Sequence, residues 1–243
     1  MPSVWFAIPS AKRPDEWSTL PLWRLRGYKV AVFRDEGAEP HPVADLNIFG
    51  QYEGYPKAVN RLCREILQRE PDTEWIVTGG DDIAPDPKIA PEKIALSCSL
   101  NFATVGNIPE WCWRTCKKPE TFGVMQPCGD QYMIQGGKTA TERVCESPWM
   151  GAEFCRRMYG GRGPLCEEYF HFFCDEDLHC VAEKLGVLWH RPDLIHYHHH
   201  WGREGKPRPE YLHPARLNWH GAQPLLNERK AAGFPGHEPL GAA

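Results

Sequence analysis

The sequence predicts an α/β fold in which helices cover both faces of a mainly parallel sheet. Three observations support it. Short apolar runs alternate with stretches of helical periodicity, the runs end in Pro, Gly or Asp as buried strands do, and 42% of the 243 residues are hydrophobic, enough for a substantial core. Alternating strands and helices are typical of a parallel sheet covered on both sides.

Two strands and one helix are expected near the N-terminus. The runs 4–10 and 28–37 are apolar, and the first ends at Pro9 while the second ends in charged residues and glycine. The stretch 14–27 between them fits a helix. Because Pro21 lies inside that stretch, the helix must begin late or be kinked.

A clearer helix is expected over residues 55–71. Pro56 suits its first turn and Pro71 lies just past its end. Its apolar positions recur at helical spacing: Val59, Leu62, Cys63 and Ile66. The run 73–80 then supplies a further strand, which stops at two glycines.

The C-terminal half contains one well-marked helix and one extended run. Residues 175–186 carry an apolar stripe and end at Gly186, a frequent helix stop. The stripe consists of Leu178, Val181, Ala182 and Leu185. The run 187–201 reads as extended chain.

Charge and composition limit the class of protein. The formal net charge is −4, so the chain lacks the basic footprint of a nucleic-acid binder. Its first residues contain no basic segment before an apolar run, and no stretch approaches the ~18 apolar residues of a membrane span. We expect a soluble cytoplasmic protein without a membrane partner. The ten cysteines of this long chain are expected to be reduced thiols.

Two adjacent carboxylates follow the strand at 73–80. Parallel sheets bind ligands at the carboxyl ends of their strands, which is where Asp81 and Asp82 fall. Carboxylate oxygens on a rigid support can hold a hard divalent cation that carries a diphosphate. The alternative is a turn, because Gly-Gly-Asp-Asp followed by Pro85 and Pro87 is also good loop chemistry.

The histidine-rich segment 196–200 could add an imidazole to such a metal. In extended chain His196, His198 and His200 point to one face, and Tyr197 and His199 to the other. The alternative is a solvated loop.

Three consecutive acids, Asp175, Glu176 and Asp177, begin the helix at 175–186. One or two are explained by capping and by the helix dipole. A third adds repulsion, which in a cleft could tune one carboxylate as a general base.

Cysteines offer a second metal hypothesis. Cys112, Cys116 and Cys128, with the segment 174–180, could assemble a structural zinc site. Their spacings match no well-defined zinc finger or ribbon, so ordinary buried or surface thiols are the alternative.

Several short motifs in this order carry a resemblance. They are "FAIPS", "YPKAVN", "WIVTGGDDIAPDP", "ESPWMGAEF", "CDEDL" and "HYHHHW", spread over about residues 4 to 203. Together they resemble GT-A glycosyltransferases that use nucleotide sugars, especially the large inverting family and its phage-encoded relatives. The resemblance implies a GT-A (Rossmann-like) fold with a single domain over 1–243. It further implies a nucleotide-sugar-binding part at about 1–130, an acceptor or catalytic part at about 131–205, and a C-terminal tail at 206–243.

The resemblance also implies a donor site. Asp81 looks like a contact of the ribose or of a metal ligand, and Lys57 and Asn60 look like residues near the nucleotide. Three residues at the ends of the first two strands look like nucleoside contacts: Pro9, Ser10 and Asp35. The donor would be a nucleotide sugar, with a UDP-sugar preferred.

The same resemblance implies a metal site and a base. Asp82 looks like the direct ligand of Mn²⁺ or Mg²⁺ in a DXD-type motif, with His198 as the C-terminal ligand and His196 as its closest competitor. The "CDEDL" acids nominate Asp177 first and Asp175 second as the base of an inverting transfer. This chain has Gly-Asp-Asp where the full motif is Asp-x-Asp, and it lacks the Gln-x-x-Arg-Trp signature of processive enzymes.

Further contacts complete the hypothesis. The basic loop with Arg203 and Lys206 would assist the diphosphate. In "SPWMG", Trp149 could stack on an acceptor and Gly151 could allow it to approach closely, although a core Trp before a helix explains the same residues.

The acceptor remains open among a modified DNA base, a glycan and a small molecule, and the location would be the host cytoplasm if the gene belongs to a phage. Two other functions stay as alternatives. A nucleotidyltransferase would use a related sheet and metal-bound carboxylates, but "IPSAKRPDEW" lacks the glycines of its phosphate loop. A non-catalytic, zinc-stabilised binding protein would use the Cys and His content.

Overall fold

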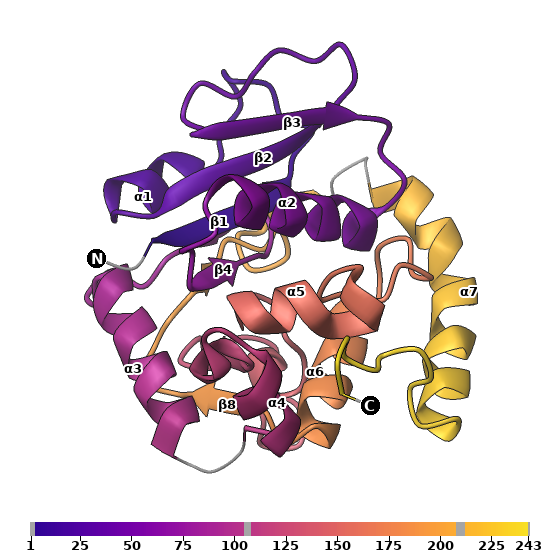
Figure 1. The fold of residues 1–243 in the computed structure, drawn as a ribbon. Helices are drawn as coiled ribbons and strands as arrows, with labels where there is room; N and C mark the ends of the chain where they lie inside the picture. Colours follow the sequence, from indigo (N-terminus) through magenta and orange to yellow (C-terminus); the bar gives the residue numbers. More distant parts are fainter. Residues whose placement is uncertain (1–2, 105–107, 208–211, 243) are drawn as a thin grey trace.

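The computed structural model describes residues 3–104, 108–207 and 212–242, with side chains of the last range described from residue 219 (Figure 1). Its strands are β1 (Val4–Pro9), β2 (Lys29–Asp35), β3 (Leu46–Gly50), β4 (Trp75–Val77), β5 (Ile83–Ala84), β6 (Val124–Pro127), β7 (Trp149–Gly151), β8 (Leu188–Arg191) and β9 (Tyr197–His198). Its α-helices are α1 (Leu20–Leu25), α2 (Tyr55–Arg69), α3 (Pro91–Thr104), α4 (Glu110–Thr115), α5 (Ala152–Gly161), α6 (Cys174–Lys184) and α7 (Leu212–Ala231), and two short 3₁₀ helices span Pro119–Thr121 and Ala140–Glu142.

One seven-stranded sheet organises the chain, in the order β3-β2-β1-β4-β7-β6-β8. The pairs among β1 to β4 and the pair β6–β8 are parallel, whereas β7 is antiparallel to both of its neighbours. The predicted mainly parallel α/β fold is confirmed. Both halves of the chain contribute strands to the same sheet.

Helices lie on both faces of this sheet, as two neighbouring residues of β1 show. Phe6 stacks on Trp23 of α1, with ring centroids 3.8 Å apart and an interplanar angle of 2°. The indole of Trp5 instead donates to Glu70, at the C-terminal end of α2. Because successive strand residues point to opposite faces, α1 and α2 must cover opposite sides. Figure 1 shows α5 beside α2, and the two helices are in contact.

The predicted elements recur with shifted limits. The helix expected at 14–27 begins at Leu20, so Pro21 falls in its first turn, where its missing N–H has no cost. The run expected as one extended segment at 187–201 is divided. Its first part is β8 in the main sheet, and its second part is β9, which pairs with β5 in a separate two-stranded sheet.

A strand pair and a helix pair fix the elements around the candidate site. The β5–β9 ladder pairs Ile83 with His198, which brings the aspartate motif and the histidine segment together. Helix α7 is joined to α6 by a buried ion pair between Arg229 and Asp177. Within the described ranges, no helix combines the length and the apolar character needed to cross a bilayer.

Candidate active site

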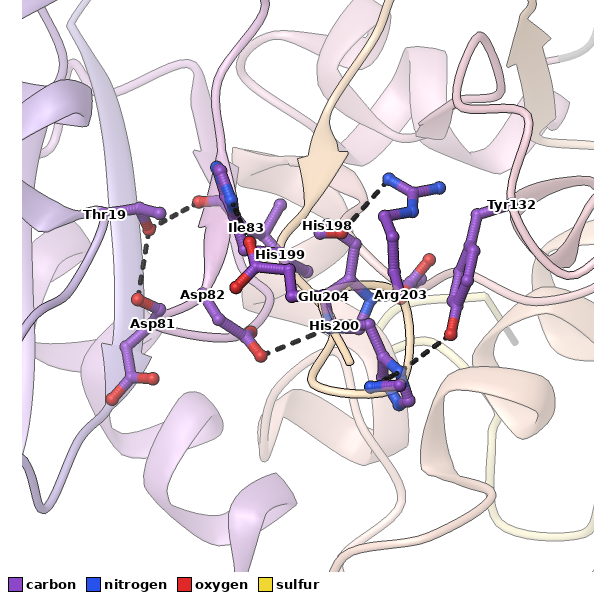
Figure 2. Close-up of polar contacts among 12 residues, drawn as sticks. Thr19, Asp81, Asp82, Ile83, Tyr132, His198, His199, His200, Arg203 and Glu204 are labelled. Carbon is purple, nitrogen blue, oxygen red and sulfur yellow. Dashed lines mark hydrogen bonds and ion pairs between the residues drawn. The ribbon is translucent and has the colours of Figure 1, made fainter. Parts of the chain in front are cut away.

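The Asp81–Asp82 segment is held between α1 and β9 by backbone contacts. The N–H of Thr19 donates to the carbonyl of Asp81 at 2.9 Å, and the hydroxyl of Thr19 donates to the carbonyl of Ile83 at 2.6 Å. The N–H of His199 donates to the carbonyl of Asp82 at 2.9 Å. Figure 2 shows the result, in which the Asp81 and Asp82 side chains point in different directions. The turn therefore directs its two carboxylates toward different neighbours.

Asp82 faces His198 across the β5–β9 ladder. Asp82 Oδ2 lies 3.3 Å from His198 Nε2, and the other ring nitrogen of His198 contacts the carboxylate of Glu146. Gly80 leaves room for this arrangement, because a Cβ there would lie 2.4 Å from Asp82 Oδ1. The imidazole is thus oriented by a carboxylate on each side.

The charges of this trio are coupled. Burial opposes the charged imidazole, but the contacts with Asp82 and Glu146 outweigh it and raise the pKa of His198 to about 10. Burial likewise opposes the charged carboxylate, yet the contact with His198 lowers the pKa of Asp82. In the absence of a metal, Nε2 therefore carries a proton, which a metal ion would have to displace.

Asp82 and His198 fit one divalent ion as adjacent ligands. Ligand atoms with metal bonds of about 2.0–2.3 Å lie about 2.8–3.3 Å apart when they occupy neighbouring octahedral positions. The 3.3 Å between Asp82 Oδ2 and His198 Nε2 matches this range. Glu146 on Nδ1 would fix the ring and its tautomer, as partners of metal-bound histidines do. Among the residues that the structure describes, no three His, Cys, Asp or Glu side chains form a ready-made metal site.

His196 lies away from this trio, in the core. Its Nε2 accepts a hydrogen bond from the Trp149 indole at 3.4 Å, so the proton must sit on Nδ1, which is 2.6 Å from Ser147 Oγ. Burial lowers the pKa of His196 to about 3. The ring is a neutral structural group with both nitrogens engaged, so the structure does not place His196 at the candidate metal site.

Asp82, Glu146 and His198 line one pocket with a volume of about 350 Å³. Asp175, in the first turn of α6, lines the same pocket, as do His200 and Trp201 on the opposite loop. Burial, reinforced by the charge of Glu146, raises the pKa of Asp175 to about 6 even though backbone N–H groups stabilise its anion. A carboxyl group with a raised pKa thus shares a cavity with the Asp82–His198 pair.

Asp177 points elsewhere, although the sequence nominated it first as base. It is 0% exposed, and its carboxylate accepts hydrogen bonds from Tyr159 at 2.8 Å, Tyr169 at 3.2 Å and Arg229 at 2.6 Å. Two residues along a helix correspond to about 200° of rotation, so Asp177 faces the core when Asp175 faces the pocket. The structure gives Asp177 a structural role and leaves Asp175 as the candidate base.

The end of β1 forms a second polar cluster beside the first. Asp81 accepts a hydrogen bond from Ser10 at 2.6 Å and pairs with Lys12 at 2.6 Å. Ser10 directly follows Pro9, and Asp35 lies exposed at the end of the neighbouring strand β2. These residues gather at the carboxyl edge of the sheet, where the family resemblance would place the nucleoside.

Asn60 and Lys57 do not line the pocket that contains Asp82 and His198. Asn60 is fully buried, and its amide exchanges two hydrogen bonds with the backbone of Leu165 and donates a third to Glu167. It fixes the 163–167 loop, a structural role that replaces the predicted nucleotide contact. Lys57 lies on the rim of a different cavity.

Arg203 stabilises the loop that contains it. Its guanidinium makes a bidentate pair with Asp130, at 2.7 and 3.0 Å, and lies 4.1 and 4.5 Å from the ring centroids of Tyr132 and Tyr197. Such a pairing holds the chain after β9 in place instead of leaving a free cation for a diphosphate. Lys206 is nearer the β1 cluster, since Lys206 and Lys12 both lie over the Trp17 ring.

Trp149 and Gly151 belong to the core and not to an acceptor wall. Trp149 is fully buried in β7. A Cβ at Gly151 would lie 1.9 Å from the carbonyl oxygen of Thr121, so this glycine permits a close approach of two backbones. The core interpretation of these two residues therefore replaces the acceptor interpretation.

Three polar residues of this region were not singled out from the sequence: Lys12, Asp130 and Glu146. Glu146 carried a signal, because it is an acid set directly before a Ser-Pro turn and a strand. Lys12 carried another, as a cation just after the first strand. Neither signal shows which partner the side chain will meet.

The sequence matches no protein-family model and no curated protein. Among solved structures, one similar chain is described as a glycosyltransferase involved in the glycosylation of the major capsid of PBCV-1. The two are 14% identical, with a TM-score of 0.29. The alignment covers 63% of the present chain and 62% of the other chain, less than two thirds of its length.

Proposed function

We propose that the protein is a GT-A type glycosyltransferase that moves a sugar from a nucleotide-sugar donor, such as a UDP-sugar, to an acceptor hydroxyl with inversion. The observation that carries the proposal is the shared pocket. It joins a carboxylate–imidazole pair suited to a divalent ion, Asp82 and His198, with a separate carboxylate of raised pKa, Asp175. All three lie at the carboxyl edge of a mainly parallel sheet, where such folds bind nucleotides.

Each group has a role in this mechanism. Asp82 and His198 would hold Mn²⁺ or Mg²⁺, which when bound supplies positive charge to the leaving diphosphate. Glu146 orients His198 through Nδ1. Ser10 and Asp81 provide a hydroxyl and a carboxylate for the nucleoside at the end of β1. Asp175 takes the proton of the acceptor hydroxyl as its oxygen attacks the anomeric carbon.

A screen of nucleotide sugars tests the proposal without knowledge of the acceptor. Water can replace the acceptor, so we expect Mn²⁺-dependent hydrolysis of one donor and a rise in melting temperature with the same donor. Stabilisation by nucleoside triphosphates and sugar phosphates, with no response to any nucleotide sugar, would point instead to nucleotidyl transfer.

Asp82→Ala is expected to weaken Mn²⁺-dependent UDP binding by at least about 100-fold, because it removes a direct ligand. Its melting temperature should stay close to the parental value, since the side chain lies at a strand end and not in the core. Calorimetric titration with UDP and MnCl₂ measures the effect. Asp193→Ala, which removes an exposed carboxylate outside the pocket, is the control. Parental affinity in Asp82→Ala would remove this residue from the metal site.

The hydrolysis rate is expected to fall at acidic pH. A general base works in its deprotonated form, and the pKa of Asp175 is raised to about 6, so kcat should drop about tenfold per pH unit below pH 6 and level off above it. A profile of kcat between pH 4.5 and 8 at saturating donor and metal checks this. The acid limb should disappear from the residual activity of Asp175→Asn.

A further inference from the structure

A second cavity lies on the α2 side of the sheet, separate from the candidate active site. Its volume is about 240 Å³, and strand β2, the chain after β3 and the 162–167 loop contribute to it along with α2. Three cationic side chains line it: Lys57, Arg61 and Arg64. They are spaced i, i+4 and i+7, which places them on one stripe of the helix. Two carboxylates, Glu53 and Glu167, accompany them.

Arg61 is the central cation, and it has no carboxylate partner among the described residues. Its guanidinium lies over the ring of Phe33, 5.5 Å from the centroid. It also rests against the backbone at Gly50, where a Cβ would be 2.4 Å from Nη1. An aromatic ring and a residue without a side chain therefore hold a planar group of donors at the cavity wall.

The two flanking cations are only loosely paired. Lys57 Nζ lies 3.5 Å from Glu53, and Arg64 Nη1 lies 3.8 Å from Glu167. These pairs are partly exposed and close to the limit of an ionic contact, so each stabilises little. Three cations against two carboxylates leave one positive charge, and the charge without a partner is that of Arg61. Arg64 Nη1 also donates to the backbone carbonyl of Arg162, which fixes this side chain beside the cavity. An anionic ligand could bind Arg61 and add to the contacts of the other two cations without breaking a strong ion pair.

We propose that this cavity is a binding site for the phosphate group of a small molecule, distinct from the nucleotide-sugar site. An arginine fork matches the geometry of phosphate oxygens, and two further cations at one helical turn's distance complete the charge. The volume is below the ~300 Å³ of typical ligand pockets, which suits a phosphate with a short organic group. Free phosphate and a phosphate monoester share this chemistry.

Calorimetry with inorganic phosphate, and separately with glycerol phosphate, tests the site on the full chain. Arg61→Gln should weaken binding by about 10- to 100-fold, the loss that follows from removing a charged hydrogen-bond donor. Gly50→Ala keeps the charge but displaces the guanidinium, and should weaken binding as well. Arg69→Gln, on the same helix and paired with Glu65 outside the cavity, should bind as the parent does.

The outcomes separate this site from the donor site. UDP binding with Mn²⁺ should be unchanged in Arg61→Gln, because the cavity shares no lining residue with the candidate active site. Tighter binding of glycerol phosphate than of phosphate would identify a monoester as ligand, and equal binding would identify the free anion. The proposal is overturned if the parent binds neither probe at millimolar concentration, if Arg61→Gln binds them as tightly as the parent, or if UDP affinity falls together with phosphate affinity.

Discussion

Asp175→Asn is expected to slow nucleotide-sugar hydrolysis by ~10²–10⁴-fold while leaving the affinity for UDP and Mn²⁺ nearly unchanged. The asparagine keeps the size of the side chain and can still accept a hydrogen bond from the helix N-terminus, but it cannot take a proton. Asp175 is also not among the side chains that contact His198. Single-turnover hydrolysis of the donor found by screening, measured beside UDP titrations, separates the two quantities.

Glu176→Gln is the matched control for this experiment. Glu176 is the next residue of the same helical turn, but its carboxylate pairs with Lys230 of α7 at 2.7 Å and does not line the pocket. Its substitution should leave the hydrolysis rate within about twofold of the parental value, because the side chain lies outside the pocket. The fold should also be unaffected, since an exposed pair contributes little to stability. A parental rate in Asp175→Asn would move the base elsewhere, and Glu146 would be the next carboxylate to substitute.

The early part of the fold was predictable because its signals are local. Apolar runs at β1, β2 and β4 are short and bounded by Pro, Gly or Asp, and the periodicity of α2 is complete from Pro56 to Pro71. The middle of the chain gave no such pattern. Strands β6 and β7 lie in the Pro-, Cys- and Trp-rich middle, where no apolar run stands out, and they are defined by neighbours far away in the sequence.

The meeting of the two halves of the candidate site was predictable only where two local rules coincided. Asp82 directly follows a buried strand, and in extended chain the side chain of His198 alternates with those of its neighbours. Both could therefore be placed at the carboxyl edge of the sheet. These local rules cannot decide between the two aspartates or among the histidines of 196–200, because the decision depends on which element packs against each side of the segment. In extended chain His196 and His198 point to the same face. In the structure, however, His196 is enclosed by Trp149 and Ser147, whereas His198 pairs with Ile83 at the pocket.

Arg229→Ala is expected to destabilise the protein by about 3–5 kcal/mol, the cost of leaving one member of a buried ion pair without its partner. Arg229 and Asp177 have side-chain exposures of 4% and 1%, and the guanidinium Nε lies 2.6 Å from the carboxylate. For a chain of this length each kcal/mol shifts the melting temperature by about 2–4 °C, so the expected loss is roughly 6–20 °C. Asp177→Ala should cause a loss of the same order, because the buried Arg229 would keep only a long contact of 3.7 Å with the exposed Glu168.

The adjacent pair between the same two helices supplies the control. Lys230 joins Glu176 at 2.7 Å, but these side chains are 41% and 30% exposed, so Lys230→Ala should cost no more than about 1 kcal/mol. Urea denaturation measures all three variants. Replacing both members of the buried pair, as in Asp177→Leu with Arg229→Met, should recover part of the stability, because no charge is left uncompensated. The recovery stays incomplete because the hydroxyls of Tyr159 and Tyr169 lose their acceptor. If Arg229→Ala and Lys230→Ala unfold at the same urea concentration, the buried pair does not anchor α7. If Asp177→Ala instead abolishes hydrolysis without loss of stability, the role of base that we propose for Asp175 belongs to Asp177.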